Sequence, residues 1–143
     1  MWTHAHTVET ELPSEAIWQV LSDIDGWTSW DTSMERIELL GPFAVGTEIA
    51  MTPKGQDPVR STIVAVEPNE LYVDEVGFGD LTLRFAHALT RLDSGGTRLT
   101  FQLDISGPAA DEAGPTLGPQ ITEDFPEAMA ALVAAATAAN IAR

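Results

Sequence analysis

One histidine lies where a strand pattern places an apolar side chain. In the segment 81–91 every second residue is apolar, and His87 takes one of these positions between Phe85 and Leu89. An imidazole exchanges a proton near neutral pH and donates or accepts a hydrogen bond, so in an apolar pocket it can hold a ligand or act as a general acid and base. The alternative is a core histidine that is bonded within the protein. Both interpretations of His87 are open from the sequence.

A second strand pattern, LYVDEV, carries two acidic residues on opposite faces. Glu75 shares its face with two aliphatic residues, whereas Asp74 shares its face with Tyr72. The aliphatic set predicts that Glu75 points inward, where it would raise the pKa of His87 or orient its tautomer, and that Asp74 lies in water. Tyr72 is the other candidate partner of the imidazole. A bulge near the following glycines would exchange the two carboxylates, and a solvated acidic face is the alternative.

Other chemical motifs are weak or absent in this chain. His4 and His6 have a spacing that holds a metal when a third ligand converges, but polar residues near the chain terminus explain them better, and we predict no metal. GFGDLT lacks the third glycine of a dinucleotide fingerprint, and the chain has no GxSxG, P-loop or HExxH motif. Cysteine is absent, which excludes a thiolate nucleophile and disulfides. We therefore predict no cofactor.

Charge and length limit the classes of partner. The chain has 7 basic and 22 acidic residues in 143, a formal charge of −15, and this charge repels nucleic acid and anionic lipid surfaces. No apolar run approaches the roughly 20 residues that cross a bilayer, and the N-terminus lacks the pattern of a signal peptide. We expect one domain, residues 1–143, in the cytoplasm as a monomer or homodimer, with no nucleic-acid partner and no membrane insertion.

The periodicity of apolar residues predicts the helices and strands that hold these side chains. Residues 3–10 alternate as a polar strand, Pro13 opens a short helix, and Trp27, Trp30 and Met34 predict a second helix over 27–34. Period-2 patterns separated by turn residues then predict six further strands. These strands are RIELLG, GTEIAMTP, VRSTIVAVE, LYVDEV, DLTLRFAHALTRL and TRLTFQLDIS. The last two form a hairpin across Ser94-Gly95-Gly96, so the faces of Phe85 and Phe101 should be continuous.

The C-terminal segment 117–143 reads as one long helix after a loop rich in glycine and proline. Its apolar stripe includes Leu117, Ile121, Phe125 and Met129, and its alanines have high helix propensity. Pro126 lies inside the stripe, which predicts a kink or break near Thr122.

This order of elements resembles the helix-grip fold of the START/SRPBCC superfamily, which includes the major birch pollen allergen. The segment LPSEAIWQVLSDIDGWTSWDTSM is similar to the entry motif of its polyketide cyclase/dehydrase-like branch, followed by GTEIAMT, IVAVEPNEL, GGTRLTF and DFPEAMAAL. The resemblance implies an α+β fold in which a curved antiparallel sheet of about seven strands wraps around the long C-terminal helix. It also implies a cavity for an apolar or amphipathic small molecule.

The expected cavity is lined by aromatic and aliphatic side chains around a few polar groups. Trp27 is the expected rim contact, Trp30 is expected to be structural, and Phe78 is a candidate gate on a glycine-flanked loop. The full set of expected ligand contacts is Trp27, Trp30, Tyr72, Phe78, Leu83, Phe85, His87, Phe101, Leu103, Leu117, Ile121, Phe125 and Met129.

Three functions remain open from the sequence. The first is binding of an apolar ligand that is neutral or cationic, since the negative field of the chain disfavours anions. The second is a cyclase or dehydratase that uses His87 with help from Glu75 or Tyr72 and titrates near pH 6–7. The third is a chaperone-associated interaction domain, which would need a large exposed apolar patch.

Overall fold

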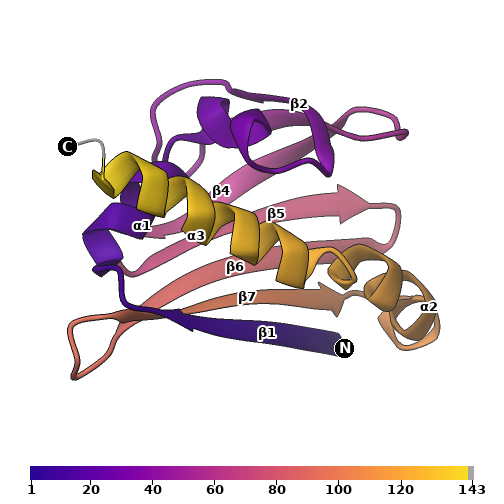
Figure 1. The fold of residues 1–143 in the computed structure, drawn as a ribbon. Coiled ribbons are helices and arrows are strands. Elements are labelled where there is room, and N and C mark those ends of the chain that lie inside the picture. The colour runs from indigo at the N-terminus through magenta and orange to yellow at the C-terminus, as the bar shows by residue number, and fades with distance from the viewer. Residues whose placement is uncertain (142–143) are drawn as a thin grey trace.

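A single antiparallel sheet of seven strands forms one layer of the molecule (Figure 1). The strand order is β1-β7-β6-β5-β4-β3-β2, and the number of strands agrees with the seven that the alternating patterns predicted. The computed structural model describes residues 1–141. Its elements are β1 (Trp2–Thr10), α1 (Ser14–Leu21), the 3-10 helix η1 (Ile24–Ser29), β2 (Met34–Leu39), β3 (Glu48–Pro53), β4 (Val59–Glu67), β5 (Leu71–Phe78), β6 (Leu81–Arg91), β7 (Thr97–Ser106), α2 (Ala110–Thr122) and α3 (Phe125–Ile141).

The hairpin of β6 and β7 carries the predicted apolar face. Its register pairs His87 with Phe101 and Phe85 with Leu103. Residues directly opposite in an antiparallel pair point to the same side of the sheet, so the faces of the two strands are continuous, as the alternation predicted. The turn includes Gly95 at a φ of 92°, a conformation that glycine adopts without steric cost.

The second short helix is shorter than the sequence predicted. The tryptophan spacing predicted a helix over 27–34, but η1 ends at Ser29 and β2 begins at Met34. Between them the side chain of Asp31 accepts hydrogen bonds from the backbone N–H of Ser33 at 3.0 Å and from its hydroxyl at 2.6 Å. This side-chain turn satisfies the local backbone without helix.

The C-terminal helical region breaks where predicted but begins earlier. α2 ends at Thr122 and α3 begins at Phe125, which confirms the expected break. Pro126 lies in the first turn of α3, where its missing N–H removes no helical hydrogen bond. The glycine- and proline-rich segment assigned to a loop is helical from Ala110, so that assignment is wrong.

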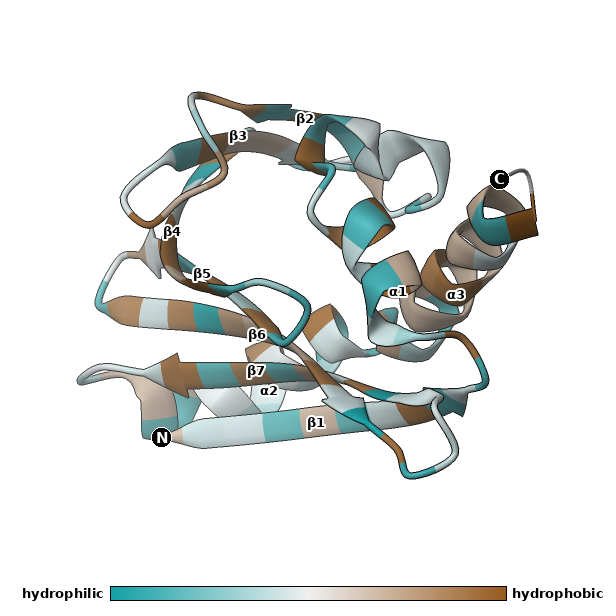
Figure 2. Ribbon diagram, turned by 90° about the vertical axis from the view of Figure 1, so that its left-hand side faces the viewer, coloured by the Kyte–Doolittle hydropathy of each residue, from teal (hydrophilic) through white to brown (hydrophobic). Residues whose placement is uncertain are grey.

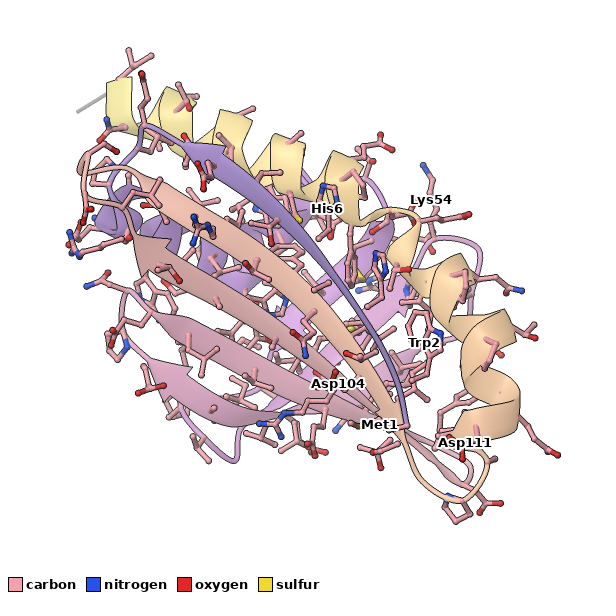
Figure 3. The ribbon with its side chains drawn as sticks, turned by 90° about the horizontal axis from the view of Figure 1, so that it is seen from below. Met1, Trp2, His6, Lys54, Asp104 and Asp111 are labelled. Carbon is pink, nitrogen blue, oxygen red and sulfur yellow. The ribbon has the colours of Figure 1, made fainter. Side chains whose placement is uncertain are left out.

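α2 tolerates glycine because it packs on a tryptophan at the start of β1 (Figure 3). A Cβ atom on Gly118 would lie 2.4 Å from Cη2 of Trp2, and one on Gly114 would lie 2.4 Å from the Trp2 Cβ. The two glycines therefore let the indole lie directly against the helix backbone.

The core lies between the concave face of the sheet and the helices α1 and α3. Figure 2 shows the sheet curling from β1 to β2 with α1 and α3 on its inner side. Fully buried side chains from each layer meet there, including Ile17, Leu21, Ile63, Leu99, Leu103, Ile105, Met129 and Leu132. Within residues 1–141, none of the helices has the length and apolar character needed to span a membrane.

Candidate functional site

His87 lies on the concave face and is only 6% exposed. Its Nδ1 lies 3.0 Å from the backbone oxygen of Tyr72 on the adjacent strand. A carbonyl oxygen can only accept, so in the neutral ring Nδ1 carries the proton and Nε2 keeps a free lone pair. The His87 ring stacks on the Tyr72 ring, with centroids 4.8 Å apart and planes at 9°. One nitrogen is thus held by the protein, as in a core histidine, and Nε2 is the one left for a ligand.

A buried carboxylate lies on the adjacent strand, two residues from the tyrosine that stacks on this histidine. Asp74 is 3% exposed, and its Oδ2 accepts hydrogen bonds from the Tyr72 hydroxyl at 2.5 Å and the Ser61 hydroxyl at 3.4 Å. Ser61 comes from β4, and the other two residues from β5. We call Ser61, Tyr72, Asp74 and His87 the polar cluster. Its members reach one region of the concave face from three adjacent strands.

The predicted inward orientation of Glu75 is wrong. The β5–β6 register pairs Tyr72 with His87, which places Tyr72 and Asp74 on the concave face. Glu75 points to the other face, where its carboxylate accepts a hydrogen bond from Nη1 of Arg84 at 2.7 Å and its side chain is 32% exposed. The prediction failed because Val73, on the same outer face as Glu75, is also buried, at 2% exposure, so an apolar residue does not mark the inner face of this strand. Glu75 therefore cannot orient the imidazole of His87.

Burial shifts the pKa values of all three titratable members of the cluster. It raises the pKa of Asp74 to about 6, although hydrogen bonds from Tyr72 and Ser61 act to lower it. Burial, with the nearby Asp74 charge, raises the pKa of the Tyr72 hydroxyl far above its usual value. Burial lowers the pKa of His87 to about 4, partly offset by its bond to the Tyr72 carbonyl. At pH 7 the imidazole is neutral and the phenol protonated.

Aromatic rings surround the polar cluster. Trp27 meets His87 at 5.8 Å and Tyr72 at 6.1 Å between ring centroids, and Phe101 meets His87 edge-on at 4.8 Å. Trp27 was expected at a rim, but it is buried, and its Nε1 donates to the backbone oxygen of Leu21 at 2.9 Å. The interior is therefore lined mainly by aromatic rings, and the polar atoms of the cluster lie among them.

The other expected contacts differ in burial. Buried side chains among them are Trp30, Leu83, Phe101, Leu103, Phe125 and Met129. Half-buried side chains that pack against the core are Phe85, Leu117 and Ile121. Phe78 is 58% exposed at the end of β5. His4 is exposed and stacks on Trp2, and no group of three or more metal-ligating side chains occurs in residues 1–141.

Sequence reasoning missed one ring that closes the site. Phe43 lies in the loop between β2 and β3, which the pattern PFAVG marked only as a turn. Its ring is 5.2 Å from that of Tyr72 and 6.0 Å from that of Trp18 on α1. A large aromatic residue between a proline and a glycine in a turn was the signal available. Phe43 is half-buried, so it lies between the polar cluster and solvent.

Two pockets on the described surface lie away from the polar cluster. One, of about 310 Å³, lies between α1, η1 and α3 and is bordered by Gln19, Asp23, Trp30 and Ala135. Another, of about 370 Å³, lies at the β4–β5 turn and the end of β6. Neither includes His87 or Asp74. Because the interior rings contact one another, a ligand that reaches Asp74 must displace at least one of them.

Comparisons with known proteins agree with this architecture. A family model described as polyketide cyclase / dehydrase and lipid transport matches residues 1–137. No curated protein sequence matches the chain.

Solved structures show the same fold at low sequence identity. The Zhui aromatase/cyclase from Streptomyces sp. R1128 is 18% identical, with a TM-score of 0.78 over 94% of this chain and 93% of that one. A point mutant of norcoclaurine synthase from Thalictrum flavum is 16% identical, with a TM-score of 0.73 over 96% and 95%. A START superfamily protein from Mycobacterium smegmatis is 15% identical, with a TM-score of 0.70 over 89% and 93%. These likenesses confirm the predicted helix-grip fold.

Proposed function

The chain belongs to the polyketide cyclase/dehydrase and lipid transport family within the START/SRPBCC superfamily, and from this premise we propose that it binds an apolar or amphipathic small molecule between the sheet and α3. The polar cluster carries the proposal. A carboxylate and an imidazole are costly to bury, and a core that served stability alone would be better filled by apolar side chains. Flat rings around a few polar atoms are the usual composition of a small-molecule site.

Phe43 is the side chain that moves to admit the ligand. It is half-buried on a loop between Pro42 and Gly46, whereas the other rings around the cluster come from strands and helices. Gly46 has a φ of 97°, and its N–H donates to the backbone oxygen of Ile63 at 2.8 Å, which holds one end of the loop to β4. A swing of the Phe43 ring toward solvent opens the Tyr72 side of the interior while leaving the sheet intact.

A ligand screen tests the binding function. A library of polycyclic and fatty compounds is screened against the freshly purified protein by shift in melting temperature, because a ligand that binds only the folded state stabilises it by mass action. Native mass spectrometry on the same sample looks for a co-purified lipophile. We expect at least one class of apolar compound to raise the melting temperature in a concentration-dependent way. No shift in the wild type or in Phe43→Ala across the library would contradict the proposal.

Catalysis of a cyclisation or dehydration is the second candidate, and the tautomer of His87 favours it. Such a reaction needs a base that removes a proton from a carbon beside a carbonyl, and an acid that protonates the departing oxygen. Nε2 of His87 has the free lone pair for the first task, and the Tyr72 hydroxyl or a protonated Asp74 can serve the second. Asp74 takes the assisting role that the sequence assigned to Glu75.

The acidity of His87 distinguishes catalysis from binding. Because burial lowers the pKa of His87 to about 4, the base stays neutral well below the pH 6–7 titration that its ordinary pKa suggested. Turnover of a poly-β-keto substrate analogue should persist to about pH 5 and be lost in His87→Ala. The matched control, Glu75→Gln on the opposite face, should retain turnover. Equal turnover in His87→Ala and the wild type would remove the catalytic role.

A further inference from the structure

The interior carboxylate has no cationic partner in the described part of the chain. Both donors to Asp74, the hydroxyls of Tyr72 and Ser61, are neutral and reach the same oxygen, Oδ2. No hydrogen bond within residues 1–141 reaches Oδ1. A buried carboxylate is normally paired with a positive charge, because hydroxyl donors alone do not replace its hydration. Oδ1 is not fully enclosed, since the completely buried side-chain polar atom without a partner in the described residues is Trp30 Nε1, and the carboxylate therefore keeps one open acceptor with a negative charge.

The basic side chains of residues 1–141 all lie on the surface. Several are already paired there with glutamates: Arg60 with Glu48, Arg84 with Glu75, Arg91 with Glu15 and Arg98 with Glu9. Asp31, another buried carboxylate, accepts two hydrogen bonds from Ser33 in its own turn. Asp74 is thus the buried acid whose requirement for positive charge is not met by its described neighbours.

We propose that the ligand of this interior carries a protonated amine on an apolar or aromatic body, and that the ammonium group binds Oδ1 of Asp74. The inference rests on the proposed binding function and names its ligand class. Tyr72 and Trp27 add aromatic faces near this carboxylate, and such faces attract an ammonium group. The formal charge of −15 draws cations toward the protein at long range.

The neighbouring titratable groups do not compete with an amine. Asp74 is bonded to Tyr72 on its own strand and to Ser61 on β4. His87 from β6, Trp27 from η1 and Phe43 from the β2–β3 loop contact the ring of Tyr72. Burial keeps the pKa of His87 near 4, so the imidazole carries no positive charge at neutral pH. The cation that pairs with Asp74 must then come with the ligand.

Two probes of nearly equal shape separate the amine from its apolar body. Binding of 1-naphthylmethylamine and of 1-naphthylmethanol is measured by isothermal titration calorimetry at pH 7.5 in 0.3 M salt, which screens the surface carboxylates. We expect the amine to bind at least tenfold more tightly than the alcohol. As the pH falls below about 6 the amine affinity should fall, by up to tenfold per pH unit, because the proton on Asp74 must leave before the ammonium binds.

Two charge-matched variants locate the effect. Asp74→Asn and Glu75→Gln each remove one negative charge, the first from the concave face and the second from the outer face. We expect Asp74→Asn to lose the preference for the amine while it keeps alcohol binding, and Glu75→Gln to keep both. If Asp74→Asn does not fold, the loss of amine affinity of the wild type below about pH 6, with alcohol affinity unchanged, still tests the assignment to Asp74.

The outcomes separate this inference from the binding function. Equal affinities of amine and alcohol for the wild type would overturn the amine assignment and leave interior binding standing. An amine preference that persists in Asp74→Asn would also overturn it, because the ammonium group would then bind to a group other than Asp74. Failure of both probes to bind the wild type and Phe43→Ala would count against the binding function and the amine together.

Discussion

Asp74 and His87 titrate in opposite senses because the same burial acts on an acid and on a base. The pKa of Asp74 rises from 3.8 to about 6 on folding, so its contribution to stability is full below pH 3.8 and is lost as the pH rises through 6. The pKa of His87 falls from 6.5 to about 4, so its contribution is full above pH 6.5 and is lost as the pH falls through 4. Each change is worth about 3 kcal/mol, and the two largely cancel in the wild type.

Substitution of one group at a time should reveal how the stability contribution of the other depends on pH, because the two contributions no longer cancel. Relative to the wild type, the free energy of unfolding of Asp74→Asn should rise by about 2 kcal/mol between pH 4 and pH 6, because only the His87 contribution remains. That of His87→Gln should fall by a similar amount over the same range. Urea unfolding followed by circular dichroism across this pH range measures both. Two variant curves that run parallel to the wild type would show that neither group titrates abnormally.

Among the elements, the β2–β3 loop and α2 each have aromatic contacts that a single substitution can test. The loop reaches the interior through Phe43, which touches Tyr72 and Trp18. α2 lies on Trp2 through Gly114 and Gly118, and its own helix propensity is weakened by Pro115 and Pro119. One element thus covers the ligand region, and the other depends on a contact with β1.

Truncation of Phe43 should lower the stability of the protein and make the interior easier for a ligand to enter. Phe43→Ala is expected to lower the free energy of unfolding by about 1–2 kcal/mol, less than a fully buried phenylalanine would cost, because the ring is half-buried. The affinity for 1-naphthylmethanol should rise several-fold, since the ring no longer has to be displaced. Val45→Ala on the same loop is the control, because Val45 is 64% exposed and should change neither quantity. A loss of ligand affinity in Phe43→Ala would indicate that the ring is part of the binding surface.

Substitution of Gly118 in α2 by alanine should destabilise the protein, which is the reverse of the usual effect of this substitution in a helix. Glycine to alanine normally stabilises a helix by about 1 kcal/mol, but a Cβ on Gly118 would lie 2.4 Å from the Trp2 ring. Gly118→Ala should therefore lower the melting temperature in the wild-type background. In a Trp2→Ala background the same change should be neutral or stabilising. A higher melting temperature for Gly118→Ala alone would mean that Trp2 does not hold α2.

For the molecule as a whole, local patterns predicted the sheet better than they predicted the site. Alternation placed Phe85, His87 and Phe101 on one face because the long β6–β7 hairpin has an unbroken register. It failed for β5, where both faces are buried and hydrophobicity no longer distinguishes them: Val73 lies outside and Tyr72 inside, each nearly inaccessible. A register shift between Ile63 and Ala65 on β4 adds an irregularity that periodicity does not reveal.

The parts of the site that sequence missed depend on contacts between distant segments. Ser61 donates a hydrogen bond to Asp74 from the neighbouring strand. Phe43 contacts Tyr72 from a loop whose sequence predicted only a turn. Neither residue has a motif of its own. The resemblance to a known family gave the fold and the general position of the interior, but the identity of the acid that faces inward followed only from the register of β5.

The most direct test of interior binding is fluorine NMR of protein labelled with 5-fluorotryptophan. The chain has four tryptophans, of which Trp27 meets the polar cluster while Trp2 lies under α2. Phenylalanine substitutions assign the two resonances, and 1-naphthylmethylamine is then titrated into the unsubstituted protein. We expect a saturable shift of the Trp27 resonance with the Trp2 resonance unchanged. A shift confined to Trp2, or binding by calorimetry without any change at Trp27, would contradict the claim that the ligand lies between the sheet and α3.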